Sequence, residues 1–524
     1  MRRLLAVASG LALLVSAVAP VSHSSRALAR GDGRYAVIIV LDGQTPAGLV
    51  PSRMPNLRFL LKRGITYRQA FVGQLIAITP TSHATIGTGV FPRRHGVFGF
   101  WWKDARTNTV TRPTDTDKVD AGALEAVMSD RHVPSIAASV KAAYPGARIA
   151  SVSGHKCYAS DAMGTAAADY ILCAMIYHDR WVAQAMGRHR PPPGAVNNAR
   201  WDVPIPAPGS GFAPRVEQWR MGEENDWTVR YALWTFHRVH YPRVLMINLP
   251  ETDVLGHFAN NPTQVTDFLM QRFDRELGEI INAYRRAHIF SRTDFVITSD
   301  HGMDRIHYRL PFSIVGQSMD EAHATKVVVE SDTATAIGIA QPSRAWQVAM
   351  NLGRLGGAAV DATLYKVYSH RQWHYLPAAV HPPVTPALLR AYIALADTTA
   401  DPNGPDVLAI YAPHVTTGDR PNGAYHWLGG HLGPQWEDQH IPLIISGPGV
   451  RRGATSSYPA RLVDIAPTVE HLLGASSAGT DGVVLEDALS HPDRAGETIQ
   501  RRRSGELLPI VRLLQKRMAE GGPS

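Results

Sequence analysis

The 524-residue chain carries a formal net charge of +8, and 45% of its residues are hydrophobic. This length and composition allow a large buried core and exclude an intrinsically disordered or fibrous protein. Most of the charge lies in the terminal segments 1–30 and 497–524, which leaves the body of the chain nearly neutral. A neutral body lacks the basic stripe of a nucleic-acid-binding scaffold, so we expect no such partner.

The N-terminus has the pattern of a secretory signal. Two arginines follow Met1, and the apolar run 4–19 comes next. A basic region before a short apolar region is typical of a signal peptide, and this run is shorter than a comfortable membrane span. We expect residues 1–29 to be removed, the protein to be exported to the periplasm or the extracellular space, and the mature chain to lack a transmembrane span. A retained N-terminal anchor is the alternative.

Apolar runs and helical periodicity alternate along the chain. Continuous Val/Ile/Leu runs predict strands buried on both faces, which is typical of a parallel sheet covered by helices. A Pro-, Gly- and Asn-rich stretch at 190–214 predicts a surface excursion. The expected strands are 35–41, 147–153, 243–249, 294–299 and 441–446, and the expected helices lie near 54–63, 227–237, 263–286 and 460–473.

Two segments depart from this alternation. Residues 304–425 mix short strands and helices, and we expect them to form a cap inserted between core segments 30–303 and 426–496. Residues 497–524 predict a solvated basic helix, with weak surface attachment as a second possibility.

The two cysteines, Cys157 and Cys173, are not arranged as a CxxC motif, which disfavours a zinc or redox role. In an exported protein they can form one disulfide, and two free thiols are the alternative.

Three of the expected strands lead into residue types that bind metals. These residues are Asp42, Asp253, His257, Asp300 and His301. Ligands bind beyond the carboxyl ends of parallel strands, so we expect these side chains to converge on one site. Carboxylate and imidazole ligands suit Zn²⁺ best among the common metals, with manganese or iron as alternatives.

The chain resembles the alkaline phosphatase superfamily, and most closely its nucleotide pyrophosphatase/phosphodiesterase branch. The resemblance covers about residues 35–303 and 426–480. The motifs that carry it are Val40-Leu-Asp-Gly43, Thr79-Pro-Thr-Ser-His83 with the following turn to Gly96, Asp253-Val-Leu-Gly-His257, Thr298-Ser-Asp-His-Gly-Met303, and Gly430-His431 with the strand behind it.

The resemblance implies an alkaline-phosphatase-like three-layer α/β/α fold with a central, mostly parallel sheet and an inserted cap. It also implies a threonine nucleophile at Thr79, with Thr81 as its rival, and two divalent ions that are both expected to be zinc. One ion would be held by Asp42, Thr79, Asp300 and His301, and the other by Asp253, His257 and His431. His426 lies close to His431 in sequence and is the weaker candidate for the last ligand.

The substrate is expected to be a small phosphate ester. Phe100 stands where diesterases and some monoesterases of the superfamily carry an asparagine, and Lys156 lacks the arginine of their Lys-x-Arg pair. A single cation cannot clamp a dianion in a bidentate manner, which favours diesters over monoesters. The aromatic run 98–102, including Trp101, either stacks on a base or aryl group or packs a lid against the core.

These features predict an exported phosphodiesterase or nucleotide pyrophosphatase that forms a phosphothreonine. An alkaline phosphomonoesterase is the alternative, and a binding protein with an inactive site is a remote one. Sulfate ester hydrolysis is disfavoured, because the chain has Thr79-Pro-Thr-Ser where sulfatases need Cys/Ser-x-Pro-x-Arg.

Overall fold

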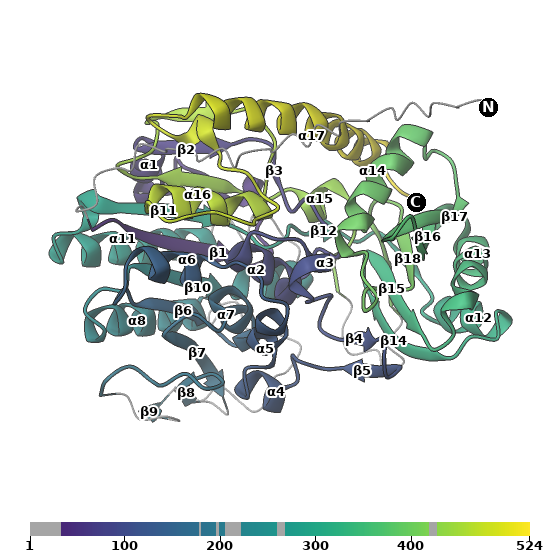
Figure 1. Cartoon of the computed structure of the whole chain (residues 1–524), viewed down its shortest axis with the longest axis horizontal. Coiled ribbons are helices and arrows are strands. Elements are labelled where there is room, and N and C mark those ends of the chain that lie inside the picture. Colours follow the sequence, from purple (N-terminus) through teal and green to yellow (C-terminus); the bar gives the residue numbers. More distant parts are fainter. Residues whose placement is uncertain are drawn as a thin grey trace, which may run out of the picture. The chain divides into compact units, whose positions relative to one another are not determined.

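A ten-stranded sheet and a five-stranded sheet dominate the unit Gly33–Ser524 (Figure 1). The computed structural model describes residues 33–177, 180–194, 199–204, 222–258, 268–418 and 427–523. The expected signal peptide, residues 1–29, lies outside the described residues and stays a prediction, as do the expected boundaries of core, cap and tail.

The central sheet is parallel through its middle and has antiparallel pairs on either side. Strands β11, β1, β10, β6 and β7 run parallel to one another. Strand β21 is antiparallel to β11 and β2, strand β8 is antiparallel to β7 and β9, and the edge pair β2 and β22 is parallel. In spatial order the strands are β22 (Ala454–Ser456), β2 (Gly64–Tyr67), β21 (Leu443–Ser446), β11 (Thr293–Thr298), β1 (Tyr35–Leu41), β10 (Val244–Leu249), β6 (Ile149–Ser153), β7 (Tyr170–Tyr177), β8 (Arg180–Ala185) and β9 (Ala199–Pro204).

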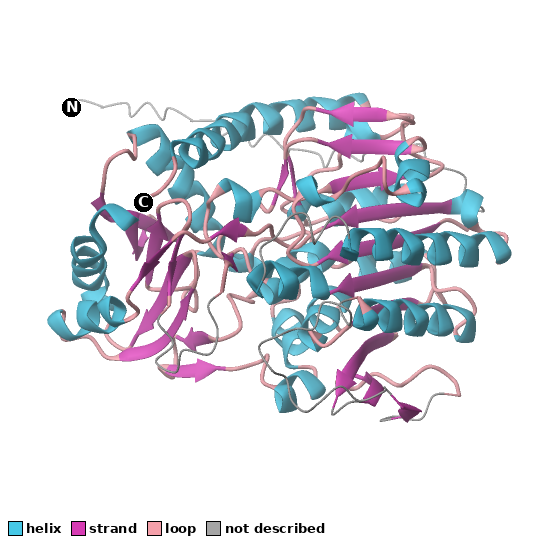
Figure 2. Cartoon of the chain, turned by 180° about the vertical axis from the view of Figure 1, so that it is seen from behind, coloured by secondary structure: helices cyan, strands magenta, loops and turns pink. Residues whose placement is uncertain are grey.

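Helices cover both faces of this sheet. In β1, Ile38 and Val40 pack into one hydrophobic cluster, and Val37 and Ile39 pack into another on the opposite face. One face is covered by α1 (Pro55–Leu61), α8 (Glu223–Arg238) and α11 (Met270–Arg286), and the other by α2 (Thr79–Thr88), α6 (Ile136–Ala143), α7 (Cys157–Gly164) and α16 (Ile465–Leu472). The expected three-layer α/β/α architecture is therefore confirmed (Figure 2).

The second sheet is antiparallel throughout. Its order is β14 (Lys326–Ser331), β15 (Ala334–Ile339), β18 (Val407–Tyr411), β16 (Val360–Ser369) and β17 (Gln372–Val380). Helices α12 (Ser313–Glu321) and α13 (Ala345–Gly356) pack on one face, and α14 (Pro386–Ala396) packs on the other. We call this sheet with its helices the cap.

Short elements complete the core and its contacts with the cap. They are α3 (Pro92–His95), the hairpin β4 (Trp102–Asp104) and β5 (Thr109–Thr111), α4 (Thr116–Asp120), α5 (Ala123–Asp130), the pair β3 (Ala70–Phe71) and β23 (Ala460–Arg461), β12 (Asp304–Arg305) with β20 (Gly429–Gly430), β13 (Tyr308–Leu310) with β19 (Val415–Thr417), and α15 (Trp436–Gln439).

The C-terminal helix α17 (Arg494–Glu520) is not the solvated basic helix that the sequence predicts. Its apolar stripe, which includes Leu507, Val511 and Leu514, is buried in a cluster shared by the cap and the core loop at 71–78. Arg517 makes a two-pronged contact with Asp361 of the cap, at 2.8 Å for both pairs of atoms. The helix therefore joins the cap to the core (Figure 1).

One other expectation needs correction. The expected helix 460–473 begins only at Ile465, because Ala460 and Arg461 pair with β3. The expected helix 263–286 is represented by α11 from Met270, and residues 263–267 lie outside the described residues. The described part of the expected surface excursion 190–214 includes β9, which pairs with β8 at the sheet edge, where its final proline is tolerated.

Cys157 and Cys173 form a disulfide, which decides between the two alternatives left open by the sequence. The bond joins the first residue of α7 to β7 across a separation of 16 residues. It therefore fixes the start of α7 on the central sheet.

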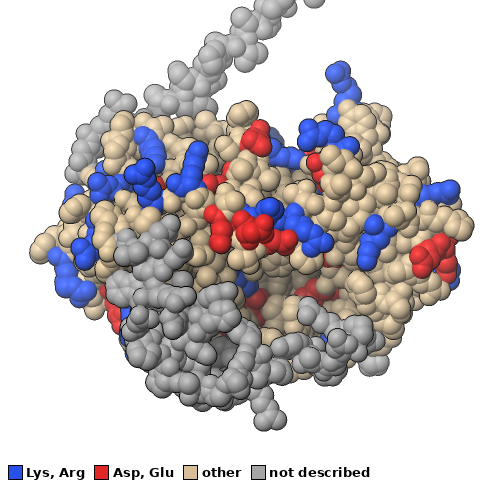
Figure 3. Space-filling model, turned by 90° about the horizontal axis from the view of Figure 1, so that it is seen from below, with Lys and Arg blue, Asp and Glu red and all other residues tan. Residues whose placement is uncertain are grey.

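On the surface shown in Figure 3, Lys and Arg side chains lie among Asp and Glu side chains. Ion pairs such as Arg94–Asp481 at 2.9 Å and Lys141–Asp169 at 2.8 Å are partly exposed.

Among the described residues, no helix combines the length and the apolar character that crossing a membrane requires.

Replacing Arg517 by methionine is expected to lower the free energy of unfolding by about 3 kcal/mol, because Asp361 would stay buried without its cationic partner. Guanidinium unfolding measures the effect. Arg503→Met is the matched control on the same helix, since Arg503 pairs with Glu506 on the surface and should change stability by less than about 1 kcal/mol. Equal effects of the two substitutions would contradict the role assigned to the Arg517 contact.

Candidate metal centre

The predicted ligands gather where three neighbouring central strands end. Strands β11, β1 and β10 are parallel, so their carboxyl ends meet at one edge of the sheet. Asp42 follows β1, Asp300 and His301 follow β11, and α9 (Glu251–Phe258), which carries Asp253 and His257, follows β10.

Gly43 lets two of these loops approach closely. Its φ is +67°, and a Cβ atom here would lie 2.8 Å from the Cα of Asp253. Its backbone N–H donates to Asp300 Oδ1 at 3.1 Å. A side chain at this position would therefore separate the carboxylates of β1 and α9.

The side chains form two overlapping groups of possible metal ligands. Asp42, Asp300 and His301 form one, and Asp253, His301 and His431 form the other, with all ligand atoms of a group within 4.8 Å of one another. His257 lies beside the second group, with Nε2 at 3.3 Å from Asp253 Oδ1. The sequence places His301 with the first ion alone, whereas its ring lies between the two groups. The rival His426 lies outside the described residues.

Backbone carbonyls orient the three imidazoles. Nδ1 of His257, His301 and His431 lies 2.9 Å from the carbonyl oxygens of Gly429, Gly302 and Ala77, respectively. A carbonyl oxygen accepts only, so each Nδ1 carries the proton, and in the neutral ring Nε2 then presents a lone pair. This is how proteins orient histidines that bind metals.

Two carboxylate oxygens of the site lack a hydrogen-bond donor. Oδ1 of Asp253 and Oδ2 of Asp300 are buried and accept no hydrogen bond. Burial and the neighbouring carboxylate of Asp300 raise the pKa of Asp42 above its usual value. Burial alone would lower the pKa of His431, but the charge of Asp253, whose Oδ1 lies 3.4 Å from Nε2, outweighs it and raises that pKa to about 9. A divalent ion would take the place of the proton on Nε2, and carboxylate oxygens facing imidazole lone pairs fit such an ion.

Thr79 lies at the first position of helix α2 and is completely buried. Its Oγ1 is 3.3 Å from Nε2 of His301. The free N–H groups and the dipole of a helix N-terminus favour negative charge at this point. Thr81, the rival nucleophile, has a buried hydroxyl that lacks a hydrogen-bond partner, and its carbonyl oxygen accepts from Thr85 within the same helix.

Lys156 lies deeper in the site than its predicted substrate-binding role requires. Its Nζ donates to Asp42 Oδ1 at 2.6 Å, to Asp253 Oδ2 at 2.7 Å and to Thr79 Oγ1 at 3.2 Å. The side chain is 6% exposed. It therefore contacts both ligand groups and the hydroxyl between them.

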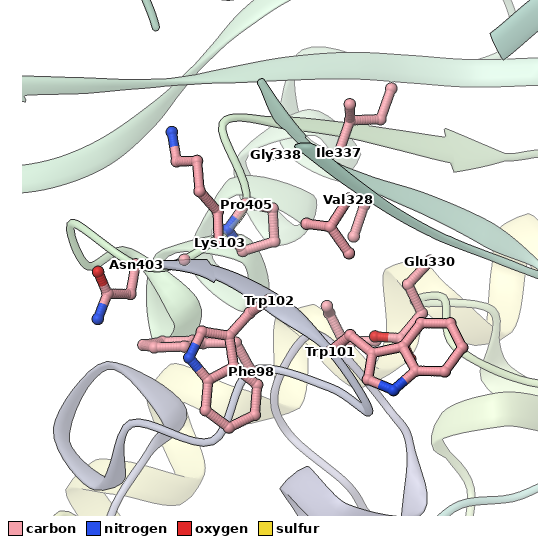
Figure 4. A pocket seen from close by; sticks show the side chains of 13 residues that line it. Phe98, Trp101, Trp102, Lys103, Val328, Glu330, Ile337, Gly338, Asn403 and Pro405 are labelled. Atoms are coloured by element: carbon pink, nitrogen blue, oxygen red, sulfur yellow. The ribbon is translucent and has the colours of Figure 1, made fainter. Parts of the chain in front are cut away.

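In the aromatic segment 98–102, some side chains pack in the interior and one is exposed. Phe100 packs edge-on against Tyr158, with ring centroids 5.3 Å apart, and its N–H donates to Glu330 of the cap at 3.0 Å. Trp101 is 40% exposed, whereas Trp102 is buried against Phe98. Figure 4 shows Trp101 beside Glu330 at a pocket between this segment and the cap. Trp101 donates its Nε1–H to Asp115 at 3.0 Å and lies under the Arg112 guanidinium, and the rest of its ring is more accessible than that of Trp102.

Two residues near the ligands were missed by the sequence analysis. Asn248 donates to Asp42 Oδ2 at 3.1 Å, and its position as the one amide within the apolar run of β10 could have indicated it. Asp332 of the cap accepts from the backbone N–H of His431 at 3.1 Å. No local pattern marks Asp332, because the contact joins segments that are far apart in the sequence.

Known structures share this fold. Murine ectonucleotide pyrophosphatase/phosphodiesterase 5 superposes with a TM-score of 0.56 at 16% identity, over 87% of this chain and 100% of that chain. The human protein of the same name gives 0.57 at 17% identity, with the same coverage. Wild-type alkaline phosphatase PafA gives 0.62 at 15% identity, over 87% of this chain and 99% of that chain. None of the curated protein sequences compared with this chain matches it.

A family match extends over most of the sequence. Residues 36–424 match the family described as type I phosphodiesterase / nucleotide pyrophosphatase. This range includes β1, α2, α9 and β11, which carry all the predicted ligands except His431. The chain therefore belongs to the type I phosphodiesterase / nucleotide pyrophosphatase family and is a hydrolase of phosphate esters, and its fold is shared by alkaline phosphatase PafA.

Proposed function

We propose that the protein is an exported two-metal phosphodiesterase or nucleotide pyrophosphatase that acts through a phosphothreonine at Thr79. One observation carries the proposal: the Thr79 hydroxyl, at a helix N-terminus, lies 3.3 Å from the His301 imidazole that the two Asp/His groups share. A threonine hydroxyl attacks phosphorus efficiently only when a neighbouring group lowers its pKa.

The two groups suit two divalent ions. Asp42, Asp300 and His301 with Thr79 would hold one ion, and Asp253, His257 and His431 would hold the other. Their nitrogen and oxygen donors fit zinc. Such ions, when bound, lower the pKa of a hydroxyl group and stabilise the departing oxygen of a phosphate ester.

The residues of the chain then have distinct parts in the reaction. Thr79 Oγ1 gives up its proton to solvent and attacks phosphorus, forming the Oγ1–P bond as the bond from phosphorus to the leaving oxygen breaks, and the leaving oxygen takes up a proton from solvent. Water then attacks the phosphothreonine: its oxygen bonds to phosphorus as the Oγ1–P bond breaks, the water loses a proton and Oγ1 regains one. This step releases a phosphomonoester from a diester substrate, or phosphate from a monoester. The N–H groups at the start of α2 favour the negative charge that develops at Oγ1 in both steps.

Two features favour diesters over monoesters. Within the described part of the chain, Lys156 is the one lysine or arginine that contacts the Thr79 hydroxyl, and a single ammonium gives no bidentate clamp for a dianion. Phe100 offers no side-chain donor. A structure of murine ectonucleotide pyrophosphatase/phosphodiesterase 5 contains AMP in an inactive threonine-to-alanine form, which supports a nucleotide as one substrate class and a threonine as the nucleophile here. A monoesterase remains the second candidate, because Lys156 lies beside the nucleophile.

Export is part of the proposal. The disulfide between Cys157 and Cys173 supports it, because such bonds persist in oxidising compartments.

Thr79→Ala is expected to lower kcat/KM by roughly a thousandfold or more, because the hydroxyl that attacks phosphorus is lost. Thr79→Ser should retain activity, and Thr81→Ala should change it little. Rates on an aryl phosphodiester measure the loss, and mass spectrometry of acid-quenched enzyme should detect a phosphorylated Thr79 peptide. Equal losses from the two alanine substitutions would contradict the assignment.

Chelation is expected to abolish activity, and added Zn²⁺ should restore it. Metal analysis should find two ions per wild-type chain and fewer in Asp300→Ala. Glu251→Gln is the matched control, since this buried carboxylate lies on α9 beside Asp253 but accepts from the backbone of Asn225, so this variant should keep both ions. Full activity without bound metal would rule out the mechanism.

Aryl or nucleotide diesters are expected to give a higher kcat/KM than the matching monoesters. Trp101→Ala should weaken the binding of large substrates by up to about 1–3 kcal/mol, which is the contribution of one stacked base. It should leave the binding of small substrates unchanged. Trp346→Ala replaces a tryptophan of α13 that is 49% exposed and should have no effect. A tenfold preference for monoesters would favour the monoesterase instead.

A further inference from the structure

The ammonium of Lys156 uses all of its hydrogen-bonding capacity inside the candidate metal centre. An ammonium has three N–H donors, and Nζ has three acceptors, namely Asp42, Asp253 and Thr79. The contacts to the two carboxylates, at 2.6 and 2.7 Å, are the short ones that charged partners make.

These acceptors belong to both ligand groups. Asp42 is a member of the group with Asp300, and Asp253 is a member of the group with His431. Asp42 is completely buried and Asp253 is 4% exposed, so water cannot screen their mutual repulsion. The ammonium of Lys156 is the cation that the structure places against these two carboxylates.

A divalent ion held by the ligand groups would lie close to this ammonium. Zinc binds carboxylate oxygens at about 2.0–2.2 Å, and Asp253 offers it Oδ1, the neighbour of the Oδ2 that the ammonium contacts. Two cations so close in a buried site repel each other strongly. Metal binding therefore requires that Nζ withdraw.

The backbone around Lys156 is anchored on both sides. His155 Nδ1 lies 2.8 Å from Glu224 Oε1, and Cys157 is bonded to Cys173. The ammonium can therefore withdraw by rotation of the lysine side chain, because its four-carbon stem has several rotatable bonds.

We propose that Lys156 is the built-in counter-ion of this centre: it neutralises Asp42 and Asp253 before metal binds, and divalent ions displace it. The inference rests on the proposed metal centre and is independent of the identity of the substrate. Lys156 stabilises the protein that has not yet acquired metal, and it weakens the affinity of the centre for metal by the same interaction.

The test compares Lys156→Met with the wild type at two levels of metal. In chelator-treated protein, Lys156→Met should lower Tm by several degrees, because two buried carboxylates lose their counter-ion. In Zn²⁺-saturated protein the two Tm values should agree closely. The affinity for Zn²⁺, measured by competition with a chromophoric chelator, should rise by about tenfold or more in the variant.

Lys103→Met is the matched control. Lys103 is 2% exposed and its ammonium contacts Asp406 in the cap, so it is a buried, paired lysine away from the centre. This substitution should lower Tm equally with and without Zn²⁺ and should leave the affinity unchanged. Lys156→Gln keeps an N–H donor without the charge. If Lys156→Met does not fold without metal, Lys156→Gln should fold and still bind Zn²⁺ more tightly.

The outcomes separate the two proposals. If the wild type binds no Zn²⁺, the proposed function fails. If the wild type binds two ions but Lys156→Met and Lys156→Gln bind them with unchanged or weaker affinity, only the counter-ion role is overturned. Equal loss of Tm at both metal levels would also overturn it, since Lys156 would then be an ordinary structural lysine like Lys103.

Discussion

Three carboxylates, Asp42, Asp253 and Asp300, are buried together at the carboxyl ends of parallel strands, and their charge must be balanced. Transfer of such groups from water is unfavourable unless cations or donors meet them. The surrounding features meet this need: imidazoles oriented by backbone carbonyls, the Lys156 ammonium and, in our proposal, two divalent ions. The same concentration of charge that opposes folding therefore prepares the site for catalysis.

The cap and the C-terminal helix support the site from outside the central sheet. Asp332 and Glu330 of the cap accept from the backbone of His431 and Phe100, respectively. Helix α17 joins the cap to the core through its apolar stripe and through Arg517. The positions of the last histidine and of the aromatic segment thus depend on packing between segments that are distant in sequence.

Sequence reasoning succeeded where the signal was local and strong. The apolar run of β1 matches the observed bounds, because a strand buried on both faces must be apolar throughout. It was wrong where contacts between distant segments decide the structure. The Arg- and Lys-rich tail 497–524 suggested solvation, but one stripe of α17 is apolar and finds a partner in the cap. Residue 460 begins a strand because β3 lies beside it.

By itself, the sequence determined the central strands, the parallel character of β1, β10 and β11, and the convergence of Asp42, Asp253, His257, Asp300 and His301, since parallel strands bring their carboxyl ends to one edge. Only the tertiary structure decided that His301 lies between both ligand groups, that Lys156 bridges them, and that the two cysteines are bonded. The physical reason is the distance along the chain over which each signal acts. Periodicity within one element shows which of its faces is buried, whereas the partner of a buried charge depends on how elements distant in sequence pack together.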